Sequence, residues 1–148
     1  MGLAARIAKA VLLGVLEGAL LILGYAYLLP WATSKVLGPY AEGLHPIQLT
    51  QTYLATIGII LGLSTAARAL EGTVFSPILR SSSALFAYLV YVYYIGINRM
   101  VEVTLRGSTY VEKIRFDLLP IAASAAIFLL APSVVLPFIS YFERLAEE

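Results

Sequence analysis

One carboxylate, Glu17, lies near the middle of an apolar run that extends from residue 7 to residue 29. The run is long enough to form a membrane-spanning helix, and an ionisable group inside a membrane is costly, so it marks a candidate site by default. A buried carboxyl favours its neutral form because desolvation disfavours the charge. Glu17 is therefore a candidate for binding a proton or a cation. The alternative is a hydrogen-bonded carboxyl that only holds helices together.

A stripe of polar residues follows one helical face of the third apolar segment, at spacings of three, four and seven residues: Ser81, Tyr88, Tyr91, Asn98 and Glu102. Counting inward from the ends of the expected helices puts Tyr88 level with Glu17, so we expect the phenol to hydrogen-bond the carboxyl. Thr56 of the second segment falls in a nearby layer. The expected polar site, which lines a path or is buried between helices, comprises Glu17, Tyr88, Tyr91, Thr56 and Asn98.

Charged residues gather in two places outside the apolar runs. Arg68, Glu71 and Arg80 flank the turn between the second and third runs, where we expect a charge cluster at the membrane interface. The alternative for this cluster is a site for a headgroup phosphate. A second group alternates in sign after the third run, which is typical of a solvated, salt-bridged face and also suits a partner surface: Arg99, Glu102, Arg106, Glu112 and Arg115.

Composition excludes several other kinds of site. The chain has no cysteine, which excludes disulfides and thiolate chemistry, and a single histidine, His45, which excludes a multi-histidine metal centre within one chain. The net charge of +1 offers no basic face for nucleic acid. No nucleotide-binding, metalloprotease or nucleophile-elbow motif occurs. We therefore expect no cofactor, no metal and no nucleic-acid partner, and we do not expect an enzyme.

These residues belong to a chain with the composition of a membrane protein. Of its 148 residues, 60% are hydrophobic and 13% charged, with a mean hydropathy of +0.87, whereas soluble domains are about 25% charged. We predict an all-α integral membrane protein, a single domain built as a four-helix bundle. The scarcity of Asn, Gln, Met and Cys is also thermophile-like. The predicted spans are 7–29, 46–71, 77–106 and 109–131, the last continuing with proline kinks to about residue 142.

Small residues at four-residue spacing let two helix backbones approach closely. Gly14 and Gly18 have this spacing in the first span, and Gly58, Gly62 and Ala66 have it in the second. We expect the first two spans to pack against each other through these faces.

The segment between the third and fourth spans admits two interpretations. Residues 101–106 alternate in polarity as a strand does, and Gly107-Ser108 suits a hairpin turn. However, the charges from Arg99 to Arg106 have helical spacing, and Thr109 with Glu112 matches a capping box. We predict that the two helices extend beyond the bilayer as a short charged stalk. The alternative is a β-hairpin at 101–116.

Four spans place both termini and the turn between the second and third spans on one side of the membrane. Each side then carries five basic residues, so the charge rule gives no decision. Because the first helix often dominates orientation, we expect the N-terminus in the cytoplasm, with the chain in the cell membrane.

In gross layout the chain resembles the small multidrug-resistance exporters, with four spans, one glutamate in the first and balanced loop charge. The residues around Glu17, the long first loop and the charged segment after the third span depart from that family. No functional residue is carried over.

Two functions follow as hypotheses. The first is a homo-oligomeric channel or transporter for an ion, a proton or a small solute, with Glu17 and the polar stripe facing the path between protomers. The alternative is a non-catalytic structural or assembly subunit of a larger membrane complex, which docks partners through its stalk and small-residue helix faces.

Overall fold

The computed structural model describes residues 2–38, 44, 50–106 and 111–147. Helix α1 (Leu3–Ile22), the π-helical segment η1 (Leu23–Leu28) and α2 (Leu29–Leu37) form one continuous rod. Two single helices follow, α3 (Gln51–Ala69) and α4 (Phe75–Ile97). After the strands β1 (Met100–Arg106) and β2 (Val111–Asp117), a second continuous rod comprises α5 (Leu119–Ala125), η2 (Ala126–Leu130) and α6 (Ala131–Glu147). All four rods are long and apolar enough to cross a membrane.

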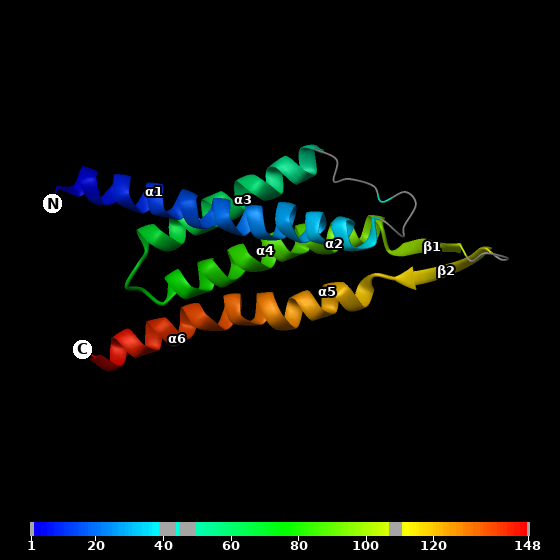
Figure 1. The fold of residues 1–148 in the computed structure, drawn as a ribbon. Coiled ribbons are helices and arrows are strands. Elements are labelled where there is room, and N and C mark those ends of the chain that lie inside the picture. The colour runs from blue at the N-terminus through cyan, green and yellow to red at the C-terminus, as the bar shows by residue number, and fades with distance from the viewer. Residues whose placement is uncertain (1, 39–43, 45–49, 107–110, 148) are drawn as a thin grey trace.

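The four rods lie side by side, with both termini and the α3–α4 turn at one end of the bundle (Figure 1). This is the arrangement that four spans require. We call this end the terminal end. The first rod has 35 residues and is therefore about 52 Å long. Its N-terminal part reaches beyond the α3–α4 turn (Figure 1).

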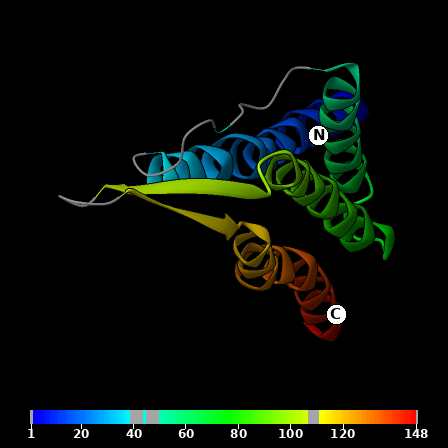
Figure 2. The ribbon, with the colours of Figure 1, turned by 90° about the vertical axis from the view of Figure 1, so that its right-hand side faces the viewer.

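Helix α4 is the centre of the bundle. It packs against α3, against α1 and η1, and against α5 and α6. Of the described elements it has the most buried residues, among them Tyr91, Tyr94 and Ile95. Among the described residues, the first and fourth rods make no substantial contact with each other. They lie as separate rods on either side of α4 (Figure 2).

Helices α1 and α3 approach closely at the expected glycines of α1. A methyl group at Gly14 would overlap the backbone of Thr65, and one at Gly18 would lie 3.0 Å from the Leu61 side chain. The matching prediction for α3 is wrong, because Gly58 and Gly62 have open space around them. The face of α3 that meets α1 carries Leu61 and Thr65, which lie about 100° around the helix from the small-residue face.

The two long rods each contain a widened turn directly before a proline. The Leu29 N–H bonds to the Gly24 carbonyl before Pro30, and the Ala131 N–H bonds to the Ala126 carbonyl before Pro132. A proline ring clashes with the carbonyl four residues earlier, and a π turn relieves that clash without ending the helix. The predicted stop at residue 29 is therefore wrong, and the helix continues to Leu37. The fourth rod likewise continues to Glu147.

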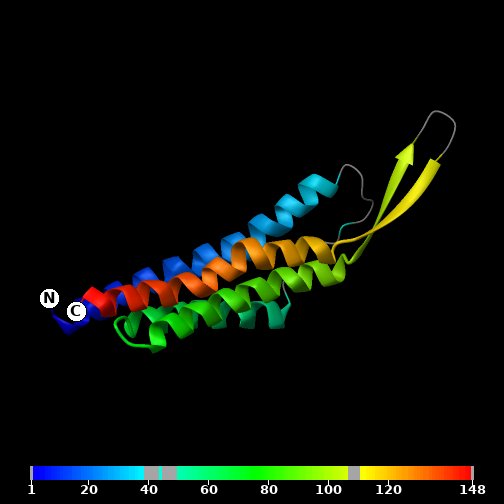
Figure 3. The same ribbon diagram turned by 90° about the horizontal axis from the view of Figure 1, so that it is seen from below.

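The segment after α4 is a β-hairpin, so the predicted helical stalk is wrong and the alternative is the one observed. Helix α4 ends at Ile97, and β1 pairs antiparallel with β2 from Met100↔Asp117 to Arg106↔Val111. The register explains the charges, because it sets Glu102 opposite Arg115 at 2.9 Å. The residues of the supposed capping start, 107–110, lie outside the described part of the chain. The hairpin projects from the bundle opposite the terminal end (Figure 3).

Candidate functional site

Glu17 lies between two arginines that come from two other helices. Its Oε2 accepts a hydrogen bond from Arg68 Nε of α3 at 2.7 Å, and its Oε1 lies 3.3 Å from Arg80 Nε of α4. Guanidinium groups remain charged at all physiological pH values. With an arginine at each oxygen, the charge of the Glu17 carboxylate is balanced within the protein.

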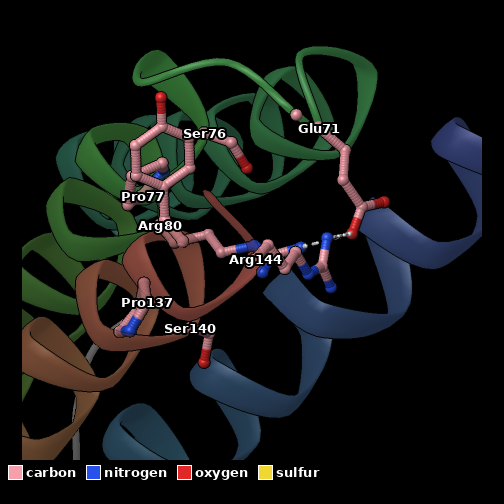
Figure 4. Close-up of a pocket in the computed structure, with 9 residues that line it drawn as sticks. Glu71, Ser76, Pro77, Arg80, Pro137, Ser140 and Arg144 are labelled. Carbon is pink, nitrogen blue, oxygen red and sulfur yellow. Dashed lines mark hydrogen bonds and ion pairs between the residues drawn. The ribbon is translucent and has the colours of Figure 1, made fainter. Parts of the chain in front are cut away.

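Glu71 extends this arrangement to the fourth rod. Its Oε1 lies 3.6 Å from Arg68 Nη1 and 3.7 Å from Arg80 Nη2, and it accepts a hydrogen bond from Arg144 Nη1 of α6 at 3.3 Å. Figure 4 shows the Glu71–Arg144 contact beside Arg80. We call these five residues the charge cluster: Glu17, Arg68, Glu71, Arg80 and Arg144. It links all four rods at the terminal end of the bundle.

The inner part of the charge cluster is shielded from solvent more than the outer part. The Arg80 and Glu17 side chains are 19% and 26% exposed, whereas that of Arg144 is 64% exposed. The Nε and Nη2 atoms of Arg80 are buried and, within the described part of the chain, form no hydrogen bond of good geometry. They contact carboxylates only at the ion-pair distances of 3.3 and 3.7 Å. Three guanidinium groups and two carboxylates give the cluster a formal charge of +1.

The expected bond between Glu17 and Tyr88 does not form. The Tyr88 hydroxyl donates to the Ala122 carbonyl of α5 at 2.8 Å. The depth count assumed that the first span enters the membrane at residue 7, but the first turns of α1 reach beyond the other helices. Glu17 therefore meets Arg68 at the end of α3 and Arg80 near the start of α4, not the middle of either helix. The structure does bring Arg68, Glu71 and Arg80 together, as expected.

The remaining residues of the expected polar site make bonds within the bundle. Tyr91 Oη lies 3.1 Å from Thr33 Oγ1 of α2, and Asn98 Nδ2 donates to the Tyr94 carbonyl. Thr56 Oγ1 donates to the Thr52 carbonyl one turn earlier in its own helix. These groups are distributed along the bundle and do not converge with Glu17.

Several bonded polar residues were not among the predicted site residues. Ser64 and Ser83 form a buried bond of 2.7 Å between α3 and α4, Thr33 meets Tyr91, and Arg144 joins the charge cluster. Ser64 and Ser83 lie ten and nine residues from Val74, the last residue of the α3–α4 turn, and Arg68 and Arg80 each lie six residues from it. Counting symmetrically from that turn is a signal that identifies both pairs.

The charged residues expected to form a partner surface lie on and beside the hairpin. Arg115 pairs with Glu102, and Arg99 Nε lies 3.5 Å from the Asp117 carboxylate at the base. Glu112 is exposed on β2, and Arg106 is the last residue of β1.

Two cavities lie between the first and fourth rods. One, of about 240 Å³, includes Glu17, Leu21, Arg80, Ala84 and Ser133 in its lining. The other, of about 460 Å³, is lined by α2, Tyr91 of α4, and residues of α5 and η2. Tyr25 and Tyr88 lie between the two along their helices and touch edge to face, with ring centroids 6.2 Å apart. We call this pair of cavities the interspan groove.

No group of three His, Asp or Glu side chains within the described ranges is placed to hold a metal ion. Comparison with protein-family models, with curated proteins and with solved structures finds no match to this chain.

Proposed function

We propose that this chain is a multi-pass integral membrane protein and a non-catalytic structural subunit of a membrane complex. The observation that carries the proposal is that polar side chains of this chain form bonds between its helices. Glu17, Tyr88 and Tyr91, which would line a transport path, instead bond one rod to another, while the interspan groove and the projecting hairpin are left uncovered.

The charged residues support a placement in the bilayer. No charged residue occurs at 18–34, 51–67, 81–98 or 118–142. From Arg80 to its end at Ile97 α4 rises about 26 Å, close to the hydrocarbon thickness of about 30 Å. The charge cluster then lies at one boundary, and Lys35, Arg99 and Asp117 lie at the other. The basic residues Arg6 and Lys9 favour an N-terminus in the cytoplasm of a cell.

The transport hypothesis has less support. It needs Glu17 and the polar stripe of α4 to face a path, but Glu17 is held by two arginines. Tyr88 and Tyr91 are bonded to neighbouring rods. A helix–helix hydrogen bond in a membrane stabilises by about 0.6 kcal/mol. Groups used in this way contribute to rigid packing.

The surfaces left over suit a partner. The open face of α3 at Gly58 and Gly62 can receive another helix closely, because small residues let backbones approach. The hairpin presents paired charges outside the bundle. A two-stranded hairpin is marginal on its own, so a partner would also stabilise it.

Two measurements test the proposal. We expect purified protein in liposomes to give no proton or ion flux above that of protein-free liposomes. We expect extraction into lipid nanoparticles to recover partners at fixed stoichiometry, and an Ala variant of Arg99 and Arg115 to lose them. Flux that falls in a Glu17→Gln variant would overturn the proposal in favour of transport.

A further inference from the structure

We infer that the interspan groove binds one anionic phospholipid, with its phosphate at Arg80 and Arg144 and one acyl chain along α4. The inference rests on the proposed placement in a membrane. The inference names the chemical class of one ligand, an anionic phospholipid, for the proposed subunit.

The groove follows one face of α4. Arg80 and Ala84 line the smaller cavity and Tyr91 lines the larger one, with Tyr88 between them, so the floor repeats at helical spacing. The walls come from the first and fourth rods, which lie on either side of α4 (Figure 2) and, among the described residues, make no substantial contact with each other. In the proposed placement these cavities face the bilayer, where hydrocarbon chains would fill them.

The groove is charged at one end only. The larger cavity contains three hydroxyl-bearing residues, Thr33, Tyr91 and Ser124, and their hydroxyls are all bonded to protein atoms. Its remaining lining is apolar, with Leu29 and Phe128 among the residues that form it. At the other end lie Glu17 and Arg80. A phospholipid has the same order of polarity, from a charged head to a hydrocarbon tail.

The charged end has the character of a phosphate site. Arg80 also lines a cavity of about 30 Å³ with Ser76, Ser140 and Arg144 (Figure 4). The charge cluster carries +1, and Arg80 contacts its carboxylates at 3.3 and 3.7 Å. Charge-assisted bonds are normally about 2.7–2.9 Å long. A phosphate oxygen near Arg80 and Arg144 would balance the excess charge, at the ends of helices where headgroups lie.

The size of the groove favours a lipid over a helix of another chain. An α-helix about 10 Å in diameter and about 28 Å long needs about 2200 Å³. The two cavities have volumes of only about 240 Å³ and about 460 Å³. An acyl chain is thinner than a helix and needs correspondingly less space.

Native mass spectrometry of the full chain tests this with phosphatidylglycerol and phosphatidylcholine. We expect one phosphatidylglycerol to be retained and phosphatidylcholine to be released. Ala32→Phe fills the larger cavity from an exposed position, so we expect it to lower retention about tenfold by displacing methylene groups. The matched control is Ala55→Phe on the open face of α3, which should leave retention unchanged.

A second pair of variants tests the headgroup. Arg144→Gln, at an exposed position, should lower retention about fivefold, whereas Arg6→Gln should not. Equal retention of both lipids would overturn the inference. So would unchanged retention in Ala32→Phe, equal thermal stabilisation by inorganic phosphate alone, or a second protein chain that Ala32→Phe displaces. Ion flux in liposomes bears only on the subunit proposal, so the two failures can be told apart.

Discussion

The two sides of α1 differ sharply. On one side α1 meets α3 along a close seam, with Gly14 against the Thr65 backbone and Glu17 bonded to Arg68. On the other side the first rod faces the fourth across the interspan groove. Both sides are apolar, so hydrophobicity does not distinguish them. In a lipid environment, helices associate through close packing of small residues and through polar bonds, and only the seam has both.

The largest expected effect comes from closing the approach at the seam. Gly14→Leu should destabilise the protein by about 3 kcal/mol, because any Cβ there overlaps the Thr65 backbone. The free energy of unfolding in bicelles, measured by SDS titration, checks this. Gly62→Leu is the control, since its position is open, and it should change stability by less than about 0.5 kcal/mol. Equal effects of the two variants would show that the seam is not a close contact.

The next effect comes from removing the charge at the seam. Glu17→Gln leaves Arg68 and Arg80 with only their longer contacts to Glu71 and should cost about 2 kcal/mol. A fully buried broken pair costs about 3–5 kcal/mol, but these side chains are partly exposed. Thermal unfolding in detergent should show the loss. Glu143→Gln, at an exposed position with no ion pair among the described residues, should behave as wild type. A Glu17→Gln protein as stable as wild type would show that the charge cluster does not stabilise the fold.

A smaller effect is expected where the seam between α3 and α4 depends on hydroxyls. Ser83→Ala removes bonds to Ser64 and to the Ile60 carbonyl and should cost about 1 kcal/mol. A double-mutant cycle with Ser64→Ala isolates the coupling between the two hydroxyls. Ser124→Ala, whose hydroxyl bonds only within its own helix, should be close to neutral. Strict additivity of the two seam variants would rule out a direct bond.

The smallest effect is expected outside the bundle. Arg115→Gln breaks an exposed pair with Glu102 on the hairpin and should change stability by no more than about 0.3 kcal/mol. Because the hairpin belongs to neither side of α1, Arg115→Gln measured in the same unfolding assay serves as the reference for the variants at the α1–α3 seam. A loss comparable to that of Glu17→Gln would mean that the hairpin is coupled to the bundle.

The sequence predicts some of these features well because they depend on local pattern. Four apolar runs give four rods, Gly14 and Gly18 mark the seam, and the short α3–α4 turn brings Arg68 and Arg80 together. The partners of Glu17 could not be read in this way. They depend on how far α1 reaches past the other helices, and the run beginning at residue 7 does not reveal that.

The other failures also have physical causes. Residues 101–106 satisfy strand alternation and helical charge spacing together, and only cross-strand pairing, as between Glu102 and Arg115, decides between them. The small-residue face of α3 lies beside the face that packs against α1, and in the sequence both faces look suitable for helix packing. The groove on the other side of α1 could not be predicted from the sequence. It exists because the first and fourth rods lack faces that fit each other, and no residue pattern marks such a lack.

The π turn at η1 also changes the phase of the first rod. From Gly14 to Thr33 an unbroken α-helix would advance five full turns and one further residue, which leaves the two positions about 100° apart. The wider turn absorbs that extra residue. Gly14 and Thr33 therefore both face the bundle and are both buried. A helical wheel drawn straight through Pro30 would place Thr33 toward lipid, so the rod must be read in two frames, one on each side of η1.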